Sequence, residues 1–184
     1  MEIKLIITDF DGTLVDTFEA NYQAYEKVFG DIGIKLSRDK YKQCFGFRFD
    51  RFMEEMGVED SNVKLFIKEE KAKIYPQFFN LLKINDPLLN FIRSIRKCGG
   101  KTVIASTARR KNLINVLDFI GAKDDFDLIL SGENVKKGKP EPEIYLRALE
   151  EMKMKADEAI VFEDSEVGIM AAQEAGINYI KITF

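Results

Sequence analysis

The segment Asp9-Phe10-Asp11-Gly12-Thr13 places two carboxylates two residues apart, where an apolar run ends and a glycine turn begins. Carboxylates in this arrangement can bind a hard cation, attack as a nucleophile, or act as an acid and a base. Asp-Gly is also common in simple turns. The motif alone therefore leaves catalysis and turn formation equally open.

A second acidic pair, Glu163 and Asp164, follows another apolar run and precedes Ser165. These carboxylates could complete a metal site with the first pair. Asp164 and Ser165 also precede a helical segment, where both residue types are common caps. Capping is the simpler explanation when this segment is considered by itself.

A lysine and two hydroxyls complete the set of candidate groups. Lys139 lies in Gly-Lys-Pro-Glu-Pro, where the prolines restrict the residues before them to extended geometry. Ser106 and Thr107 end the apolar run 102–105. Taken singly, a loop lysine is usually solvated and a serine at this place usually caps a helix.

Short apolar runs typical of buried strands recur along the chain, at Leu5–Thr8, Thr102–Ala105, Asp127–Leu130, Ala159–Phe162 and Asn178–Ile182. Helical patterns lie between the later runs, and this alternation predicts an α/β fold with a parallel sheet. Ligands bind at the carboxyl ends of such strands. We therefore expect the acidic pairs, the hydroxyls and the lysine to meet at one edge of the sheet.

Residues 17–84 show no convincing strand, and their aromatic and aliphatic side chains recur at helical spacing. This pattern predicts a helical insert after the first strand. The core domain would comprise 1–16 and 85–184, and the insert 17–84. The aromatic stripes favour a hydrophobic core over a ligand-binding box.

Carboxylates that meet in a site of low dielectric repel one another strongly. A divalent cation and the lysine would relieve that repulsion. A dianionic phosphoryl group would then fit between the cation, the lysine and a hydroxyl. The candidate groups together therefore favour phosphoryl chemistry.

The composition excludes several other site types. The 184 residues include no histidine, which rules out a Ser-His-Asp triad, a Cys-His pair and His-ligated zinc. The net charge of −3, with no basic run, gives no reason to expect a nucleic-acid partner. No apolar stretch approaches the ~20 residues of a membrane helix, and the start does not resemble a signal peptide. With two cysteines, we expect a reduced cytoplasmic monomer.

Four segments in order resemble the motifs of the haloacid dehalogenase-like superfamily: DFDGTLVDT, IAST, GKPEPEIY and FEDSEVGIMAAQEAG. They are most similar to its β-phosphoglucomutase-like branch, which contains many phosphatases. The resemblance implies a Rossmann-like core domain, a helical cap domain in the place of the insert, and Mg²⁺ as the cofactor.

The resemblance also implies roles for the acidic residues. Asp9 would be the nucleophile that forms an aspartyl-phosphate. Asp11 would be the general acid and then the base, and its backbone carbonyl would bind the metal ion. Asp164 would complete the metal site with Asp9, with Glu163 as a further ligand or as a neighbour of the ligands.

The remaining motif residues would hold the transferring phosphoryl group. Ser106 and Lys139 would contact its oxygens, with Thr107 beside them, and Lys139 would also neutralise Asp9. Such transfer depends on positioning and charge neutralisation more than on covalent assistance.

Some positions depart from the pattern of the hexose-phosphate mutases in this branch. Those enzymes usually carry a histidine where Asn21 stands here, and they grip a second phosphate with cap cations. Arg48 and Arg51 lie near the expected positions but are shifted. Arg109 follows the second motif and could contact a substrate anion, or could simply begin a helix. These four residues are the candidates for substrate specificity.

The sequence thus predicts a Mg²⁺-dependent phosphatase for a small phosphorylated metabolite, such as a sugar phosphate. A phosphosugar mutase is the nearest alternative, and a non-catalytic phosphate-binding module is an alternative of another class. The carboxylate of Asp11 argues against a dehalogenase, because an acid suits an oxygen leaving group that must be protonated.

Overall fold

The computed structural model describes residues 2–184 and divides into two compact units. The core unit comprises Met1–Asp16 and Lys83–Phe184, and the insert unit comprises Thr17–Leu82. Each unit has its own hydrophobic core and is described by itself.

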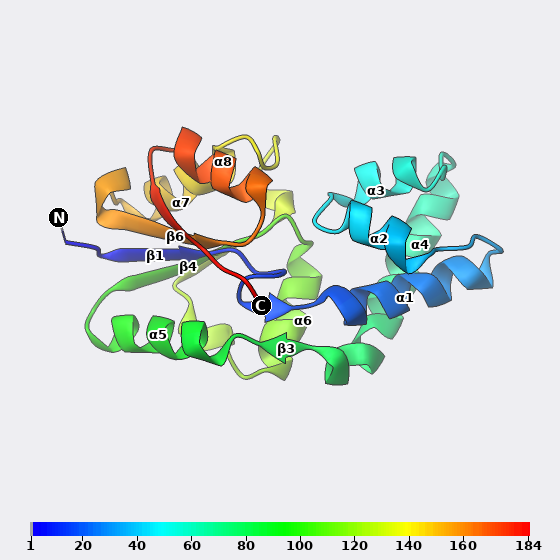
Figure 1. Cartoon of the computed structure of the whole chain (residues 1–184), viewed down its shortest axis with the longest axis horizontal. Coiled ribbons are helices and arrows are strands. Elements are labelled where there is room, and N and C mark those ends of the chain that lie inside the picture. Colours follow the sequence, from blue (N-terminus) through cyan, green and yellow to red (C-terminus); the bar gives the residue numbers. More distant parts are fainter. Residues whose placement is uncertain (1) are drawn as a thin grey trace. The chain divides into compact units, whose positions relative to one another are not determined.

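The core unit is built on a parallel sheet of five strands in the order β5-β4-β1-β6-β7 (Figure 1). The strands are β1 (Leu5–Thr8), β4 (Lys101–Ala105), β5 (Leu128–Leu130), β6 (Ala159–Glu163) and β7 (Asn178–Lys181). Strand β1 is central and pairs in parallel with both β4 and β6. The predicted parallel α/β sheet is confirmed, and all five apolar runs form its strands.

Helices cover both faces of the sheet: α5 (Asp86–Lys97), α6 (Arg110–Phe119), α7 (Glu143–Met152) and α8 (Glu166–Glu174). Figure 1 shows α7 and α8 on one side of the sheet and α5 on the other. Short 3₁₀ turns complete the connections, at η2 (Lys123–Asp125), η3 (Gly132–Asn134) and η4 (Ala156–Glu158).

One face of the sheet packs against α7 and α8. Alternate residues of a strand point to the same face, so Leu5 and Ile7 of β1 join Val103 and Val161 of the flanking strands. The helices contribute small side chains and one large ring, at Tyr145, Ala148, Ala171 and Ala172. This packing fixes the carboxyl edge of the sheet, where the candidate site residues follow the strands.

A two-residue antiparallel ribbon joins β2 (Val15–Asp16) to β3 (Lys83–Ile84). The expectation that 17–84 contains no strand is wrong at β3. A strand of two residues is too short to show the alternation by which strands are found in a sequence. Its pairing with β2 places Lys83 and Ile84 in the core unit.

The insert unit is helical, as predicted: α1 (Phe18–Asp31), α2 (Arg38–Cys44), α3 (Phe49–Glu55), α4 (Ser61–Ile74) and the 3₁₀ helix η1 (Tyr75–Leu81). Its aromatic side chains pack together, with the Tyr25 and Phe52 ring centroids 5.0 Å apart. The sequence pattern missed α2, because only Tyr41 and Cys44 of that helix are buried and its other residues are polar.

Both cysteines are free thiols, buried at Cys44 and exposed at Cys98. Within residues 2–184, no helix combines the length and the apolar character that crossing a membrane requires.

Candidate active site

Asp9 stands immediately after β1, at the carboxyl edge of the sheet. Its backbone N–H donates a hydrogen bond of 2.9 Å to the carbonyl oxygen of Phe162. This bond extends the pairing of β1 with β6 by one residue beyond Thr8 and fixes the backbone of Asp9. The side chain of Asp9 is buried, although it is charged in its ordinary state.

Lys139 joins the ends of two strands. Its Nζ donates to Asp9 Oδ1 at 2.7 Å and to Glu163 Oε1 at 2.5 Å. The lysine side chain is only 3% exposed. The interpretation of Lys139 as a solvated loop residue is therefore wrong, because both of its ion pairs are buried.

The carboxylate of Glu163, the last residue of β6, accepts four hydrogen bonds. Oε1 accepts from Lys139 and from the hydroxyl of Tyr145 at 3.2 Å. Oε2 accepts from the backbone N–H of Ser165 at 2.9 Å and from its hydroxyl at 3.0 Å. Glu163 is thus held rigidly, and in turn holds Lys139 against Asp9.

The sequence left open whether the residues after Glu163 cap a helix or complete a metal site. In the structure, Ser165 is a helix cap and Asp164 is not. Ser165 caps α8 by accepting a hydrogen bond from the backbone N–H of Gly168 at 3.1 Å. Asp164 does not cap the helix: its Oδ1 accepts from the hydroxyl of Thr13 at 2.6 Å.

Gly12 allows Asp164 to come close to the turn after β1. Its φ of +94° lies in the left-handed region that favours glycine. A Cβ atom at Gly12 would stand 2.4 Å from Asp164 Oδ2. The Asp-Gly turn is therefore needed both for its backbone conformation and for the space it leaves.

Oxygen atoms of Asp9, Glu163 and Asp164 lie within 4.8 Å of one another and could together hold a metal ion. Three carboxylates thus lie together, whereas the one ammonium group, that of Lys139, pairs with two of them, Asp9 and Glu163. Burial raises the pKa of Asp9 well above its usual value, and the charges of Glu163 and Asp164 add to this against the effect of Lys139. Burial also raises the pKa of Asp164. This excess of negative charge suits a hard divalent cation.

Burial by itself would raise the pKa of Glu163 and lower the pKa of Lys139. The attraction between the two opposite charges outweighs burial and shifts each pKa in the other direction. The ammonium and the hydrogen bonds from Ser165 hold the pKa of Glu163 below its usual value. The charges of Asp9 and Glu163 raise the pKa of Lys139 well above its usual value. Lys139 therefore stays charged at neutral pH.

The hydroxyl of Ser106 lies beside the second carboxylate of the first motif. It donates to Asp11 Oδ2 at 3.4 Å and accepts from the backbone N–H of Ala108 at 3.0 Å. Ser106 does not cap α6, whose N-cap residue is Arg109. Asp11 does not belong to the group of three carboxylates that could share an ion. Thr107 follows at the same strand end, and Gly132 packs closely against its carbonyl oxygen.

Arg109 is the specificity candidate that belongs to the core unit. Its Nε lies 3.4 Å from Glu133 Oε1 in an ion pair, and both side chains are partly exposed. Arg109 is the N-cap residue of α6, which agrees with the expectation that it begins a helix. Its contact with a substrate anion remains a prediction.

The other three specificity candidates belong to the insert unit. Asn21 Oδ1 accepts a hydrogen bond of 2.6 Å from the buried Lys71. The guanidinium of Arg51 lies 3.9 Å from the centre of the Phe47 ring, and Arg48 is the N-cap residue of α3. Their proposed contacts with a substrate remain predictions.

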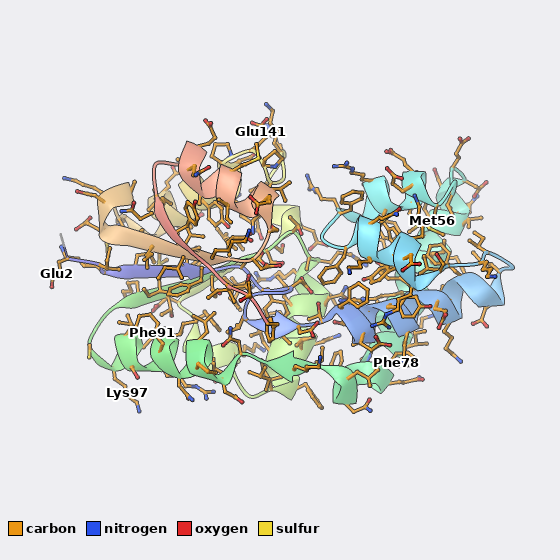
Figure 2. The ribbon with its side chains drawn as sticks, in the orientation of Figure 1. Glu2, Met56, Phe78, Phe91, Lys97 and Glu141 are labelled. Carbon is orange, nitrogen blue, oxygen red and sulfur yellow. The ribbon has the colours of Figure 1, made fainter. Side chains whose placement is uncertain are left out.

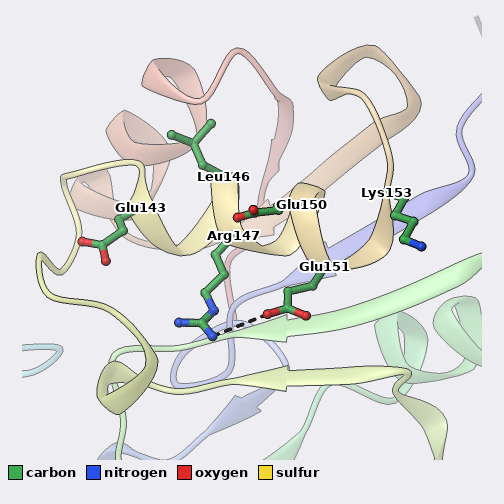
Figure 3. A pocket seen from close by; sticks show the side chains of 6 residues that line it. All are labelled: Glu143, Leu146, Arg147, Glu150, Glu151 and Lys153. Carbon is green, nitrogen blue, oxygen red and sulfur yellow. Dashed lines mark hydrogen bonds and ion pairs between the residues drawn. The ribbon is translucent and has the colours of Figure 1, made fainter.

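A surface hollow of about 610 Å³ lies along α7 (Figure 3). Five residues of α7, Glu143, Leu146, Arg147, Glu150 and Glu151, line it together with Lys153. Side chains of both charges share the hollow, and Arg147 pairs with Glu151 at 3.4 Å. None of the candidate catalytic groups lines it.

A family model described as haloacid dehalogenase-like hydrolase matches residues 6–182. The chain belongs to this family. The match covers all of the sheet except Leu5, the whole insert and all four motifs, which confirms the resemblance and the predicted class of hydrolase.

Three known proteins illustrate the similarity. The "Phosphorylated carbohydrates phosphatase" of Thermotoga maritima is 30% identical, over 97% of this chain and 84% of its own. The β-phosphoglucomutase of Bacillus subtilis is 25% identical, over 98% of this chain and 83% of its own. The crystal structure of CbbY from Rhodobacter sphaeroides in complex with phosphate shares the fold, with a TM-score of 0.89 and 24% identity, over 99% of this chain and 87% of its own.

Two residues that shape the site of this hydrolase, Tyr145 and Gly168, were not predicted from the sequence. Tyr145 is fully buried in α7, and its hydroxyl donates to Glu163. Gly168 lies in α8, where a Cβ atom would stand 1.7 Å from Glu163 Oε1. Glycine within a helix is itself a signal, because it costs about 1 kcal/mol relative to alanine and so indicates a close approach. Tyr145 gave no comparable signal.

Gly168→Ala should therefore destabilise the protein by about 1–3 kcal/mol, although alanine normally favours a helix. The new methyl group would displace the Glu163 carboxylate from its four donors. Chemical denaturation of wild type and variant measures the difference. Gly30→Ala in α1 is the matched control, since no atom lies within 4 Å of a Cβ there. We expect the control to be stabilised, and a stabilised Gly168→Ala would contradict the crowding at Glu163.

Proposed function

We propose that this hydrolase is a Mg²⁺-dependent phosphatase that acts on a small phosphorylated metabolite, such as a sugar phosphate. The buried Asp9 carboxylate, held beside the Lys139 ammonium in a cluster with excess negative charge, is the observation that carries the proposal. The similarity to a phosphatase of phosphorylated carbohydrates supports the choice of substrate class.

Asp9 and Asp164 are the carboxylates best suited to hold the cation. Both have pKa values raised by burial, so a cation would compensate charge that the protein leaves in excess. Glu163 accepts four hydrogen bonds, which occupy both of its oxygens. We therefore assign Glu163 to positioning Lys139 rather than to binding the metal. The backbone carbonyl of Asp11 is a further proposed ligand.

Bound Mg²⁺ would supply positive charge to the phosphoryl oxygens. In the first step, the Asp9 carboxylate attacks phosphorus, and the bond to the leaving oxygen breaks. Asp11 gives its proton to that oxygen and releases the alcohol. Lys139 and the hydroxyls of Ser106 and Thr107 would hold the phosphoryl oxygens during the transfer.

The second step returns the enzyme to its starting state. Asp11, now ionised, takes a proton from a water molecule that attacks the phosphorus of the aspartyl-phosphate. The bond between phosphorus and Asp9 breaks, and phosphate leaves. The hydrogen bond from Ser106 supports this role, because it restrains the side chain of Asp11 near the other strand ends.

A phosphosugar mutase would share the first step, and the similarity to β-phosphoglucomutase keeps this alternative open. Asn21 argues against it, because an amide cannot replace the histidine that such mutases usually carry as a titrating group. Specificity would depend on Arg109 and on Asn21, Arg48 and Arg51 of the insert unit.

A screen of the purified protein against phosphorylated metabolites tests the function. We expect phosphate release with Mg²⁺, a fall of at least about 100-fold with a chelator, and recovery when Mg²⁺ is restored. Undiminished release in the chelator, or no release from any phosphate monoester, would reject the phosphatase. Faster conversion of β-glucose 1-phosphate to the 6-phosphate than release of phosphate would identify the mutase instead.

A further inference from the structure

The connection from β5 to Lys139 begins with a fixed segment. Ser131 follows β5 and is buried, and its backbone N–H and hydroxyl both donate to Asn134 Oδ1, at 2.8 and 2.9 Å. Val135 belongs to the hydrophobic core that α7 shares with the sheet. The first half of the connection is therefore anchored, and residues 136–138 must be held by other contacts if they are to place the lysine.

Glu143, the first residue of α7, holds this second half. Its Oε1 accepts from the backbone N–H of Lys136 at 2.8 Å, and its Oε2 accepts from that of Lys137 at 2.7 Å. Each carboxylate oxygen thus binds one of two consecutive backbone donors. The hydrogen bonds from Lys137 and Lys136 hold the pKa of Glu143 below its usual value, so the group stays ionised at neutral pH. Hydrogen bonds to an ionised acceptor are roughly twice as strong as neutral ones.

Arg147 lies one turn further along α7 and binds the same connection. Its Nη1 donates to the carbonyl oxygen of Asn134 at 2.5 Å. Residues four apart lie on one face of a helix, and Figure 3 shows Glu143 and Arg147 on α7. The acid accepts from backbone N–H groups and the base donates to a backbone carbonyl, so this face of α7 matches the polarity of the connection at both points.

An acidic residue at the start of a helix also has a simpler explanation. A carboxylate in the first turn interacts favourably with the helix dipole, and Glu143 occupies the first turn of α7. Its hydrogen bonds, however, come from residues six and seven positions earlier, which lie outside the helix. The nearby Glu141 provides a contrast, because it lies at the surface in Figure 2, is 52% exposed, and is 3.7 Å from the ammonium of Lys137.

The backbone of the connection matters because Lys139 follows Lys137 by two residues. The Lys139 ammonium contacts two oxygens at once, at 2.7 Å from Asp9 Oδ1 and 2.5 Å from Glu163 Oε1. A lysine side chain is a flexible stem, so the place of its charge depends on what fixes each end. Glu163 fixes the ammonium end, and Glu143 fixes the backbone end. A displacement of about 1 Å in an active site can cost roughly 100-fold in rate.

We propose that Glu143 is a positioning residue for Lys139. By holding two backbone N–H groups of the connection, its carboxylate places the Lys139 ammonium beside Asp9, where the phosphoryl group would bind. The predicted effect on catalysis rests on the proposed function. The placement of Lys139 does not, and it is testable without any reaction.

A double-mutant cycle tests whether Glu143 acts through Lys139. Glu143→Gln should lower kcat for phosphate release from an aryl phosphate about tenfold, because the new amide offers one acceptor oxygen and turns an NH₂ group toward the second backbone N–H. Glu141→Gln, the same change at an exposed site nearby, should keep the wild-type rate. In a Lys139→Gln background, Glu143→Gln should cost less than about twofold. A tenfold loss in both backgrounds would overturn the proposal.

The ¹⁵N NMR signal of the Lys139 ammonium reports its placement directly. The signal is assigned as the lysine side-chain resonance that disappears in Lys139→Gln. We expect it to shift in folded Glu143→Gln and to keep its wild-type position in Glu141→Gln. An unchanged signal in Glu143→Gln would overturn the proposal. If wild type released no phosphate, the proposed function would fail, and this signal would still decide whether Glu143 places Lys139.

Discussion

Asp9→Asn should abolish Mg²⁺-dependent phosphate release while leaving the protein as stable as wild type. An amide is not a nucleophile for phosphorus, so the first step is lost, and we expect a fall of at least about 1,000-fold. Stability should not fall, because burial disfavours the negative charge of Asp9 and the substitution removes that charge. Phosphate release from an aryl phosphate and a thermal denaturation midpoint measure the two effects separately.

The matched control is Asp118→Asn on α6, where the carboxylate is 52% exposed and pairs with Lys123 at 3.3 Å. Both its activity and its stability should stay close to those of wild type. If Asp9→Asn keeps a tenth or more of the activity, or loses activity only because it unfolds, the assignment of the nucleophile fails.

Lys139→Gln should damage both stability and activity. The ammonium holds two buried carboxylates, and removing one partner of a buried ion pair costs about 3–5 kcal/mol. Phosphate release should fall at least about 100-fold, because the variant lacks a fixed positive charge for the phosphoryl group. Denaturant titration with a chelator present, followed by an activity assay with Mg²⁺, measures both effects.

The stability loss in Lys139→Gln should shrink as the pH falls from neutral. In wild type the pKa of Glu163 is lowered, so its contribution to stability is present at neutral pH and is lost as the pH falls through that pKa. Without the ammonium, burial raises the pKa of Glu163 and Asp9. Both would then be protonated at mildly acidic pH, and the variant would bury neutral groups instead of unpaired charges.

Lys137→Gln is the control for the lysine substitution. Its side chain is 71% exposed and lies 3.7 Å from Glu141, so its loss should cost under about 1 kcal/mol. Equal stability losses in the two variants at all pH values would show that the buried triad of Lys139, Asp9 and Glu163 does not stabilise the core unit.

The sequence predicts the architecture because each element carries its own local signal. The central strand Leu5–Thr8 is a continuous apolar run, as burial on both faces requires. Gly121 and Gly176 mark helix ends and adopt positive φ angles there. Short or polar elements are not predicted from the sequence, because their patterns are too weak: β3 has two residues and α2 buries only two side chains.

The sequence by itself determined which residue types follow the strands, and hence that Asp9, Asp164 and Ser106 gather at one edge of the sheet. It could not determine their partners. Only the tertiary structure decided that Lys139 is buried between Asp9 and Glu163. It also decided that Glu163 needs Gly168 beside it. Spacing along a strand or helix fixes which face a side chain occupies, whereas contacts across 130 residues depend on how those faces pack.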